Sequence, residues 1–138
     1  MTALPDAERA ALLEQLARAA TGRGLLPDAP GAHRRSPACG DDVTVRLDRT
    51  GDRITAIGWD GHGCVVSTAS ASALAGRAPI GVPQFRALAA ELLGSLDAGE
   101  QPRGLGDDLD PFAGIGRFPL RAGCASLAWR AALEALDG

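Results

Sequence analysis

Three cysteines, Cys39, Cys64 and Cys124, are the residues of this chain best suited to chemistry. They are scattered along the sequence, so no paired CxxC knuckle exists. An odd number of thiols argues against a disulfide framework and favours metal ligation or thiol chemistry. Glycine adjoins Cys39 and Cys64 and would let the backbone approach a bound ion closely, whereas Cys124 is expected near the start of a helix, where thiolate is favoured.

A closed tetrahedral zinc site takes four N, S or O ligands, so three thiolates need a fourth partner. Asp41 is the nearest candidate, because in Cys39-Gly40-Asp41 the intervening glycine allows both side chains to face one centre. His62 and His33 compete for the same position. A carboxylate binds zinc less firmly than imidazole or thiolate, so a site of three cysteines and one aspartate would suit ligand exchange better than permanence.

Each candidate also has an ordinary structural explanation. Cys124 falls on an apolar helical stripe, and a free cysteine often packs as a small hydrophobe. His62 and His33 are typical of solvated turn and loop residues, and Asp42 of a solvated residue at a strand entry. Cys39 fits a core role least, because its loop is polar and rich in helix and strand breakers.

Composition excludes several function classes. The chain has 138 residues, which fits a single domain over 1–138, and all 14 basic residues are arginine. Without lysine it can form neither a Walker A loop nor a pyridoxal Schiff base. Its net charge of −3 and 4% aromatic residues argue against a nucleic-acid partner. The N-terminus lacks the pattern of a signal peptide and no run of about 18 apolar residues occurs, so we expect a soluble, cytoplasmic protein with no membrane partner.

Periodicity predicts the elements that must position the cysteines. A helix is expected over 6–20, followed by a loop over 21–40 that contains many prolines and glycines. Alternation predicts a hairpin from strands 43–48 and 53–59. Further helices are expected over 67–75, over 83–93 with Gly94 as its end, and after Pro119, with a surface excursion over 94–111. The fold class is therefore α+β, a small antiparallel sheet of about three strands with helices packed on one face.

Three sequence blocks resemble the IscU/NifU-like iron–sulfur cluster assembly proteins. Ser36-Pro-Ala-Cys-Gly-Asp41 is similar to their N-P-x-C-G-D segment, Gly61-His-Gly-Cys64 with Ala69–Ser72 to their G-x-G-C…A-S-x-S segment, and Arg121–Trp129 to their R-x-x-C-x-x-L segment. The blocks span residues 36–130 in order. The long stretch between the second and third cysteines, with its insertion at roughly 94–111, resembles the SufU branch, as does the ending that begins at Phe118-Pro119.

This resemblance implies an IscU/SufU-like fold and a role in iron–sulfur cluster biogenesis. It implies a zinc-dependent sulfurtransferase whose metal is held by Cys39, Asp41, Cys64 and Cys124. Cys39 would accept persulfide sulfur from a SufS-type cysteine desulfurase by ligand exchange, as a histidine of the desulfurase takes its place on zinc, and a downstream Suf scaffold complex would receive the sulfur. Arg121 matches a family arginine near the site and could stabilise the anionic sulfur.

The chain departs from the family pattern at two positions. IscU scaffolds carry a histidine directly before the third cysteine and SufU proteins commonly a basic residue, whereas this chain has Gly123; Ser36 replaces the usual asparagine. Gly123 argues against the IscU ligand set and leaves Asp41 as the fourth ligand. The alternative function is a scaffold on which an iron–sulfur cluster assembles on the same thiolates, with iron in place of zinc. A third possibility is a structural zinc domain that only docks partners.

Overall fold

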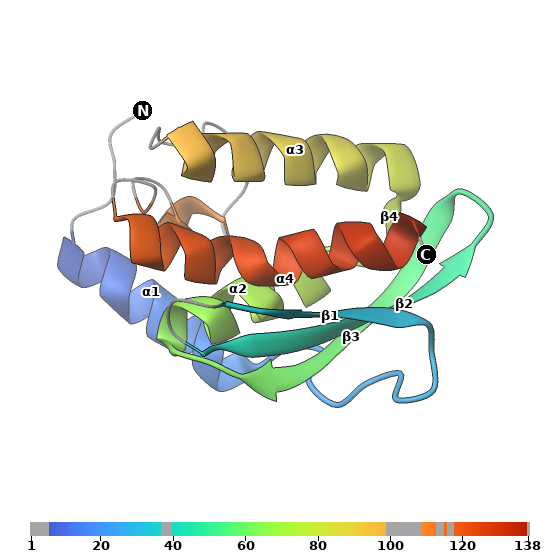
Figure 1. Cartoon of the computed structure of the whole chain (residues 1–138), viewed down its shortest axis with the longest axis horizontal. Helices are drawn as coiled ribbons and strands as arrows, with labels where there is room; N and C mark the ends of the chain where they lie inside the picture. Colours follow the sequence, from blue (N-terminus) through green and yellow to red (C-terminus); the bar gives the residue numbers. More distant parts are fainter. Residues whose placement is uncertain (1–5, 37–39, 99–108, 113–114, 116–117, 138) are drawn as a thin grey trace.

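The computed structural model describes residues 6–36, 40–98, 109–112, 115 and 118–137 (Figure 1). The elements in chain order are α1 (Asp6–Ala19), β1 (Gly31–Arg35), β2 (Asp42–Thr50), β3 (Arg53–His62), α2 (Val65–Ala75), β4 (Ile80–Gly81), α3 (Val82–Ala98), a 3-10 turn η1 (Asp110–Phe112) and α4 (Pro119–Asp137).

The four strands form one antiparallel sheet in the order β1-β2-β3-β4. Val43, Val45 and Leu47 of β2 are buried and alternate with partly exposed residues, as expected for a strand with one covered face. In the register of β2 and β3, Val45 lies opposite Trp59 and Asp42 opposite His62. The start of β2 and the end of β3 therefore lie side by side, at the end of the sheet from which the chain enters α2.

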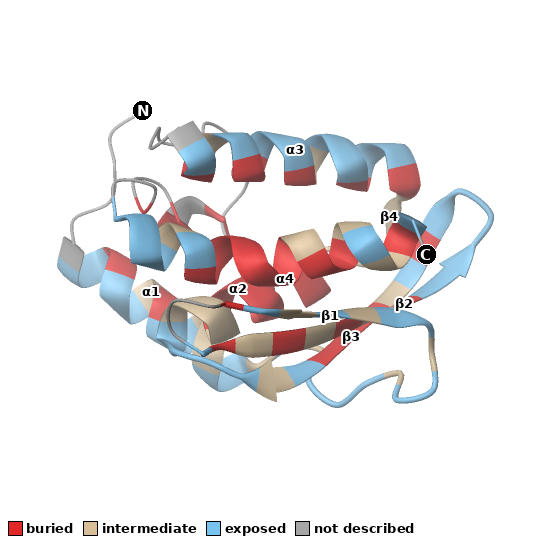
Figure 2. Ribbon diagram, viewed as in Figure 1, coloured by how far each residue is buried: buried red, intermediate tan, exposed pale blue. Residues whose placement is uncertain are grey.

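The helices pack on one face of this sheet and on each other. α4 contacts β1 and β2, α2 contacts β3, α1 packs on α2, and α3 lies on the far side of α4 from the sheet (Figure 1). Figure 2 shows buried residues concentrated between α2, α4 and the sheet. All residues from Ala69 to Ala75 are buried, and all of them except Leu74 have small side chains, which let α4 approach closely. The buried Ser70 Oγ donates to the Ala125 carbonyl oxygen of α4 at 2.5 Å.

The α+β class and the antiparallel sheet with helices on one face are confirmed, while the expected loop over 21–40 is partly wrong. Gly31–Arg35 forms β1 and Ile80–Gly81 forms β4, so the sheet has four strands and not about three. The sequence GAHRR has no apolar alternation, and its strand conformation comes from pairing with β2 and from contact with α4, including an ion pair between Arg34 and Glu134. Tertiary pairing has overridden local propensity here.

Element boundaries also differ from expectation: β3 runs to His62 and not to residue 59, and α2 begins at Val65 and not at residue 67. α3 continues through Gly94 to Ala98, because the buried Leu96 keeps its last turn in the core and a helical glycine costs only about 1 kcal/mol. The predicted surface excursion over 94–111 therefore begins inside a helix. The last residues of this predicted excursion are not at the surface, because Leu109 and Pro111 are fully buried. Residues 99–108 lie outside the described residues.

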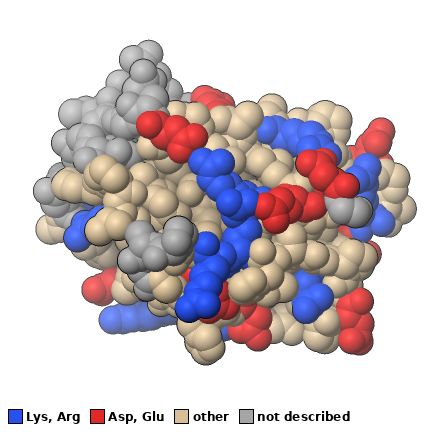
Figure 3. Space-filling model, in the orientation of Figure 1, with Lys and Arg blue, Asp and Glu red and all other residues tan. Residues whose placement is uncertain are grey.

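The outer surface shown in Figure 3 carries acidic and basic side chains interspersed over α4 and its neighbours. Several of them are paired: Arg130 with Asp97, Arg86 with Asp137, and Arg34 with Glu134. In the described part of the chain, no helix combines the length and hydropathy needed to cross a membrane.

Candidate metal centre

Asp41, Cys64 and Cys124 come together at the end of the sheet. One ligand atom from each lies within 4.8 Å of the other two. Asp41 directly precedes β2, Cys64 is the N-cap residue of α2, and Cys124 lies in the second turn of α4. Segments far apart in sequence meet here because β2 and β3 are paired and α2 packs on α4. The fourth predicted ligand, Cys39, lies outside the described residues.

The two histidines considered as alternative ligands do not join this group. Among the residues that the structure describes, Asp41, Cys64 and Cys124 are the only three His, Cys, Asp or Glu side chains with this geometry. His33 Nε2 instead lies 3.3 Å from Asp42 Oδ1, across the β1–β2 pair. His62 is exposed, opposite Asp42 at the end of β3.

The carboxylate of Asp41 is held by donors from the first turn of α2. It is 9% exposed, and its Oδ2 accepts a hydrogen bond from the Cys64 N–H at 3.2 Å and one from Ser67 Oγ at 2.5 Å. Burial raises the pKa of Asp41, but the bonds from Ser67, the Cys64 amide and the thiols of Cys64 and Cys124 together lower it below its usual 3.8. Asp41 is therefore a carboxylate at neutral pH, which is the form that ligates metal.

Helix geometry adds to this electrostatic preference. The side chains of Cys64 and Asp41 lie at the N-terminus of α2, where unpaired N–H groups and the helix dipole stabilise negative charge. The Asp41 backbone is fixed as well, because its carbonyl oxygen accepts the Ser36 N–H at 2.7 Å. The chain thus orients an anionic ligand before any ion binds.

Two glycines allow the segment before Cys64 to lie against the segment that carries Asp41. A Cβ atom on Gly63 would lie 2.8 Å from Ser67 Cβ and 3.4 Å from Asp41 Cγ. Gly61 has a φ of +149°, and a Cβ there would collide with the Asp42 carbonyl oxygen and lie 2.9 Å from Val43 Cα. The glycines beside Cys64 therefore allow the close backbone approach that the sequence predicted at this position.

Arg23 secures the same segment from the other edge of β3. Its Nη2 donates to the Gly61 carbonyl oxygen at 2.9 Å, and its guanidinium lies 5.1 Å from the ring centre of Trp59. The loop after α1 is bonded to β3 next to it, through Gly24 N to Trp59 O at 2.8 Å and Trp59 N to Gly22 O at 3.1 Å. The end of β3 is therefore held from both sides as the chain turns into Cys64.

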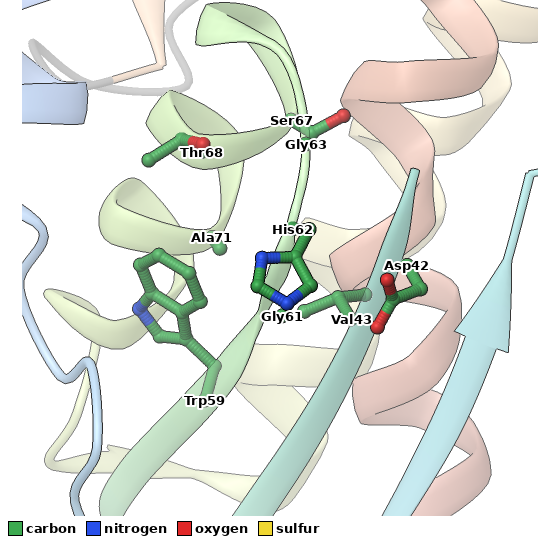
Figure 4. Close-up of a pocket in the computed structure, with 9 residues that line it drawn as sticks. All are labelled: Asp42, Val43, Trp59, Gly61, His62, Gly63, Ser67, Thr68 and Ala71. Carbon is green, nitrogen blue, oxygen red and sulfur yellow. The ribbon is translucent and has the colours of Figure 1, made fainter. Parts of the chain in front are cut away.

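A small pocket adjoins the centre between the end of β3 and α2 (Figure 4). It is a shallow hollow, partly open to solvent, and it shares Gly63 and Ser67 with the surroundings of Asp41. Figure 4 shows the His62 ring between Trp59 and Asp42, with the Ser67 hydroxyl at the other end. The hollow has room for little more than a water molecule, whereas the cluster of Asp41, Cys64 and Cys124 offers metal-ligating atoms.

Exposed apolar residues occur close in sequence to the two cysteines of the cluster. The thiol of Cys64 is exposed and that of Cys124 is buried. Val65, which follows Cys64, is 48% exposed, and Phe118 and Leu120 at the start of α4 are also exposed. Arg121 is exposed in the first turn of α4, with its guanidinium 5.6 Å from the Phe118 ring.

Sequence reasoning missed Ser67 and Arg23 as supporting residues. Ser67 had a signal, because a serine-rich run opens the predicted helix and a serine three residues after an N-cap faces the capped end. No sequence signal pointed to Arg23, since its contact with Gly61 exists only once the loop after α1 lies along β3.

The donor set fits a thiophilic ion. Two thiols and one carboxylate suit zinc or iron and not magnesium or calcium, which take oxygen ligands. Ligands at about 2.0–2.3 Å from a tetrahedral ion lie roughly 3.3–3.8 Å apart, so side-chain adjustments of about 1 Å would bring these three atoms onto one ion. Asp41, Cys64 and Cys124 would supply three of the four ligands that a tetrahedral ion takes.

Comparison with known proteins gives consistent similarities. Residues 19–79 match the family described as NifU-like N terminal domain. The chain is 33% identical over 117 residues to "Iron-sulfur cluster assembly scaffold protein IscU" of Streptococcus pyogenes serotype M1, covering 82% of this chain and 72% of that protein. It is 30% identical over 112 residues to "Zinc-dependent sulfurtransferase SufU" of Bacillus subtilis (strain 168), covering 79% of this chain and 76% of that protein. The crystal structure of a NifU-like N-terminal protein from Brucella abortus shares the fold, with a TM-score of 0.79, 22% identity and 96% of each chain covered.

Proposed function

Since the chain belongs to the NifU-like family that includes IscU and SufU, we propose that this iron–sulfur cluster assembly protein is a zinc-dependent sulfurtransferase. In this proposal it accepts persulfide sulfur on Cys39 from a SufS-type cysteine desulfurase and passes it to a downstream Suf scaffold complex in the cytoplasm. The observation that carries the proposal is the cluster of Asp41, Cys64 and Cys124, in which a carboxylate occupies a position beside two thiols.

Cys39, Asp41, Cys64 and Cys124 are the residues proposed to hold zinc. Bound zinc would keep its cysteine ligands as thiolates at neutral pH. Asp41 supports this assignment because its surroundings already favour the charged form, and a carboxylate is the least firmly bound member of such a ligand set. Cys39 is the proposed thiolate that exchanges off the site and reacts.

The proposed transfer is a thiol–persulfide exchange. The Cys39 thiolate attacks the terminal sulfur of the desulfurase persulfide, forming a new S–S bond to Cys39. The S–S bond of the donor breaks, and the desulfurase cysteine leaves as a thiolate. No external oxidant or reductant is needed, because the sulfur changes its carrier and not its oxidation state.

Arg121 is proposed to assist this exchange as a cation close to the thiolates. Its place in the first turn of α4, three residues before Cys124, and its exposure leave the guanidinium able to reach an incoming anionic sulfur. Stacking on Phe118 limits its freedom and would keep it beside the approach to the cluster.

The test measures metal content and desulfurase turnover together. Protein purified without added metal should hold about one zinc per chain, as a single four-ligand site requires, and should accelerate cysteine turnover by its desulfurase. Cys39→Ala should lose this acceleration, whereas the control His62→Ala, at an exposed residue outside the cluster, should keep it. Stimulation by Cys39→Ala equal to that of the wild type would refute the acceptor role.

A scaffold function is the second candidate, favoured by the similarity to a protein named IscU. The same thiolates could hold an iron–sulfur cluster. Anaerobic reconstitution that yields a stable chromophore, transferable to an apo-ferredoxin, would support it. Tight zinc that iron does not displace would count against it, and unchanged sulfur flux in Cys39→Ser would point to a purely structural zinc domain.

A further inference from the structure

Ser67 makes the shortest of the hydrogen bonds assigned to the Asp41 carboxylate. Its hydroxyl donates to Oδ2 at 2.5 Å, and the same oxygen accepts the Cys64 amide at 3.2 Å. Both donors belong to the first turn of α2, so they are fixed relative to each other by the helix. Ser67 Oγ also lies 3.6 Å from Cys64 Sγ and therefore touches two members of the cluster.

These contacts divide the two carboxylate oxygens into different roles. The thiols of Cys64 and Cys124 also donate toward the carboxylate, but a thiol loses its proton when it ligates a metal. Ser67 and the Cys64 amide remain donors. Both of them bond Oδ2, so Oδ1 is the oxygen that these two donors leave open, and we expect a metal ion to bind the carboxylate through Oδ1 alone.

The packing around Ser67 keeps its hydroxyl in this place. Gly63 lies against both Ser67 and Asp41, since a Cβ there would meet Ser67 Cβ at 2.8 Å, Ser67 Oγ at 3.2 Å and Asp41 Cγ at 3.4 Å. The space left by the missing side chain of Gly63 is therefore filled by the Ser67–Asp41 contact.

We infer that Ser67 is a positioning residue that anchors Asp41 as a one-oxygen ligand and thereby sets how long the site retains its metal ion. Carboxylate is the weakest donor of the proposed set, so its retention depends most on outer hydrogen bonds. Removing the outer partner of a ligand typically costs 10–100-fold in metal affinity. This inference rests on the proposed function only in taking zinc as the ion; it concerns binding and not sulfur transfer.

The experiment is a zinc competition against a chromophoric chelator, carried out on the full chain. Ser67→Ala should bind zinc about 10–100-fold more weakly than the wild type and release it correspondingly faster. Ser67→Thr, which keeps the hydroxyl, should restore much of the affinity. Thr68→Ala, at the next residue of α2 and on the wall of the same pocket, is the matched control and should bind as the wild type does.

A double-mutant cycle separates positioning from a general effect on folding. In an Asp41→Asn background the charged acceptor is gone, so Ser67→Ala should cause little further loss of zinc affinity. If the two substitutions acted independently, their fold-losses of affinity would multiply. Cobalt substitution gives a second readout, because the visible absorption of Co²⁺ reports the ligand set, and Ser67→Ala should alter it while Thr68→Ala does not.

Equal zinc affinity of Ser67→Ala and wild type, or a full extra loss in the Asp41→Asn background, would overturn the inference. The proposed function fails separately, in the desulfurase assay. A wild-type chain that does not stimulate its desulfurase leaves the role of Ser67 intact, and a normal zinc affinity in Ser67→Ala leaves sulfur transfer intact.

Discussion

Two glycines, Gly63 and Gly123, each precede a cysteine of the cluster, and the structure predicts opposite effects of replacing them by alanine. A Cβ on Gly63 would lie 2.8 Å from Ser67 Cβ, whereas a Cβ on Gly123 would meet no heavy atom within 4 Å. Neither Gly63 nor Gly123 has a positive φ, so an alanine at either position causes no backbone strain. The comparison therefore isolates steric contact at otherwise similar sites.

The magnitudes follow from these distances. Ordinary carbon contacts lie at about 3.5–4.0 Å, so Gly63→Ala overlaps Ser67 by roughly 1 Å, and such overpacking costs about 1–3 kcal/mol. Reduced entropy of the unfolded chain offsets about 0.4–1 kcal/mol, which leaves a net loss centred on about 1 kcal/mol. Gly123→Ala should gain about 0.5–1 kcal/mol, because Gly123 lies inside α4.

Urea denaturation of metal-free protein measures the free energy of unfolding of both variants, and thermal melts should separate them by about 8 °C at roughly 4 °C per kcal/mol. Zinc competition adds a functional readout, because Gly63→Ala displaces the Ser67–Asp41 contact and should weaken zinc binding, while Gly123→Ala should not. If Gly63→Ala were as stable as Gly123→Ala and bound zinc equally well, the close packing inferred around Asp41 would be incorrect.

Two further predictions concern Asp41 and the core. Because the folded-state pKa of Asp41 lies below its ordinary value, its stabilising contribution should be complete above about pH 5 and be lost as the pH falls below about 4. Urea denaturation of metal-free wild type and Asp41→Asn from pH 6 to 3 checks this, and a difference in unfolding free energy that does not shrink below pH 4 contradicts it. Trp129 is fully buried and stacks on Phe85 at 5.6 Å, and its Nε1 has no hydrogen-bond partner in the described part of the chain. Trp129→Phe keeps the stack and removes the unpaired N–H but leaves a smaller cavity, so it should cost less than Trp129→Ala, for which about 3–5 kcal/mol is expected. Equal losses in the two variants would show that the indole N–H matters more than the contacts indicate.

The helices and the β2–β3 hairpin were predictable because their signals are local. The alternation of Val43, Val45 and Leu47 and the small-residue run before Gly76 depend only on neighbours in sequence. β1 was not predictable in this way, since its residues become a strand through pairing with β2 and contact with α4. The extension of α3 past Gly94 has the same origin, in the burial of Leu96.

The sequence by itself determined the chemistry available to this protein: three thiols, one nearby carboxylate and the glycines around them, in an order similar to that of iron–sulfur assembly proteins. Only the tertiary structure decided which of these groups meet. Asp41 joins Cys64 and Cys124, while His33 and His62 stay outside the group, because the β2–β3 register and the packing of α2 on α4 set their distances. The bond from Ser67 to Asp41 likewise joins residues far apart in sequence, and such contacts are fixed by the path of the backbone and not by local preference.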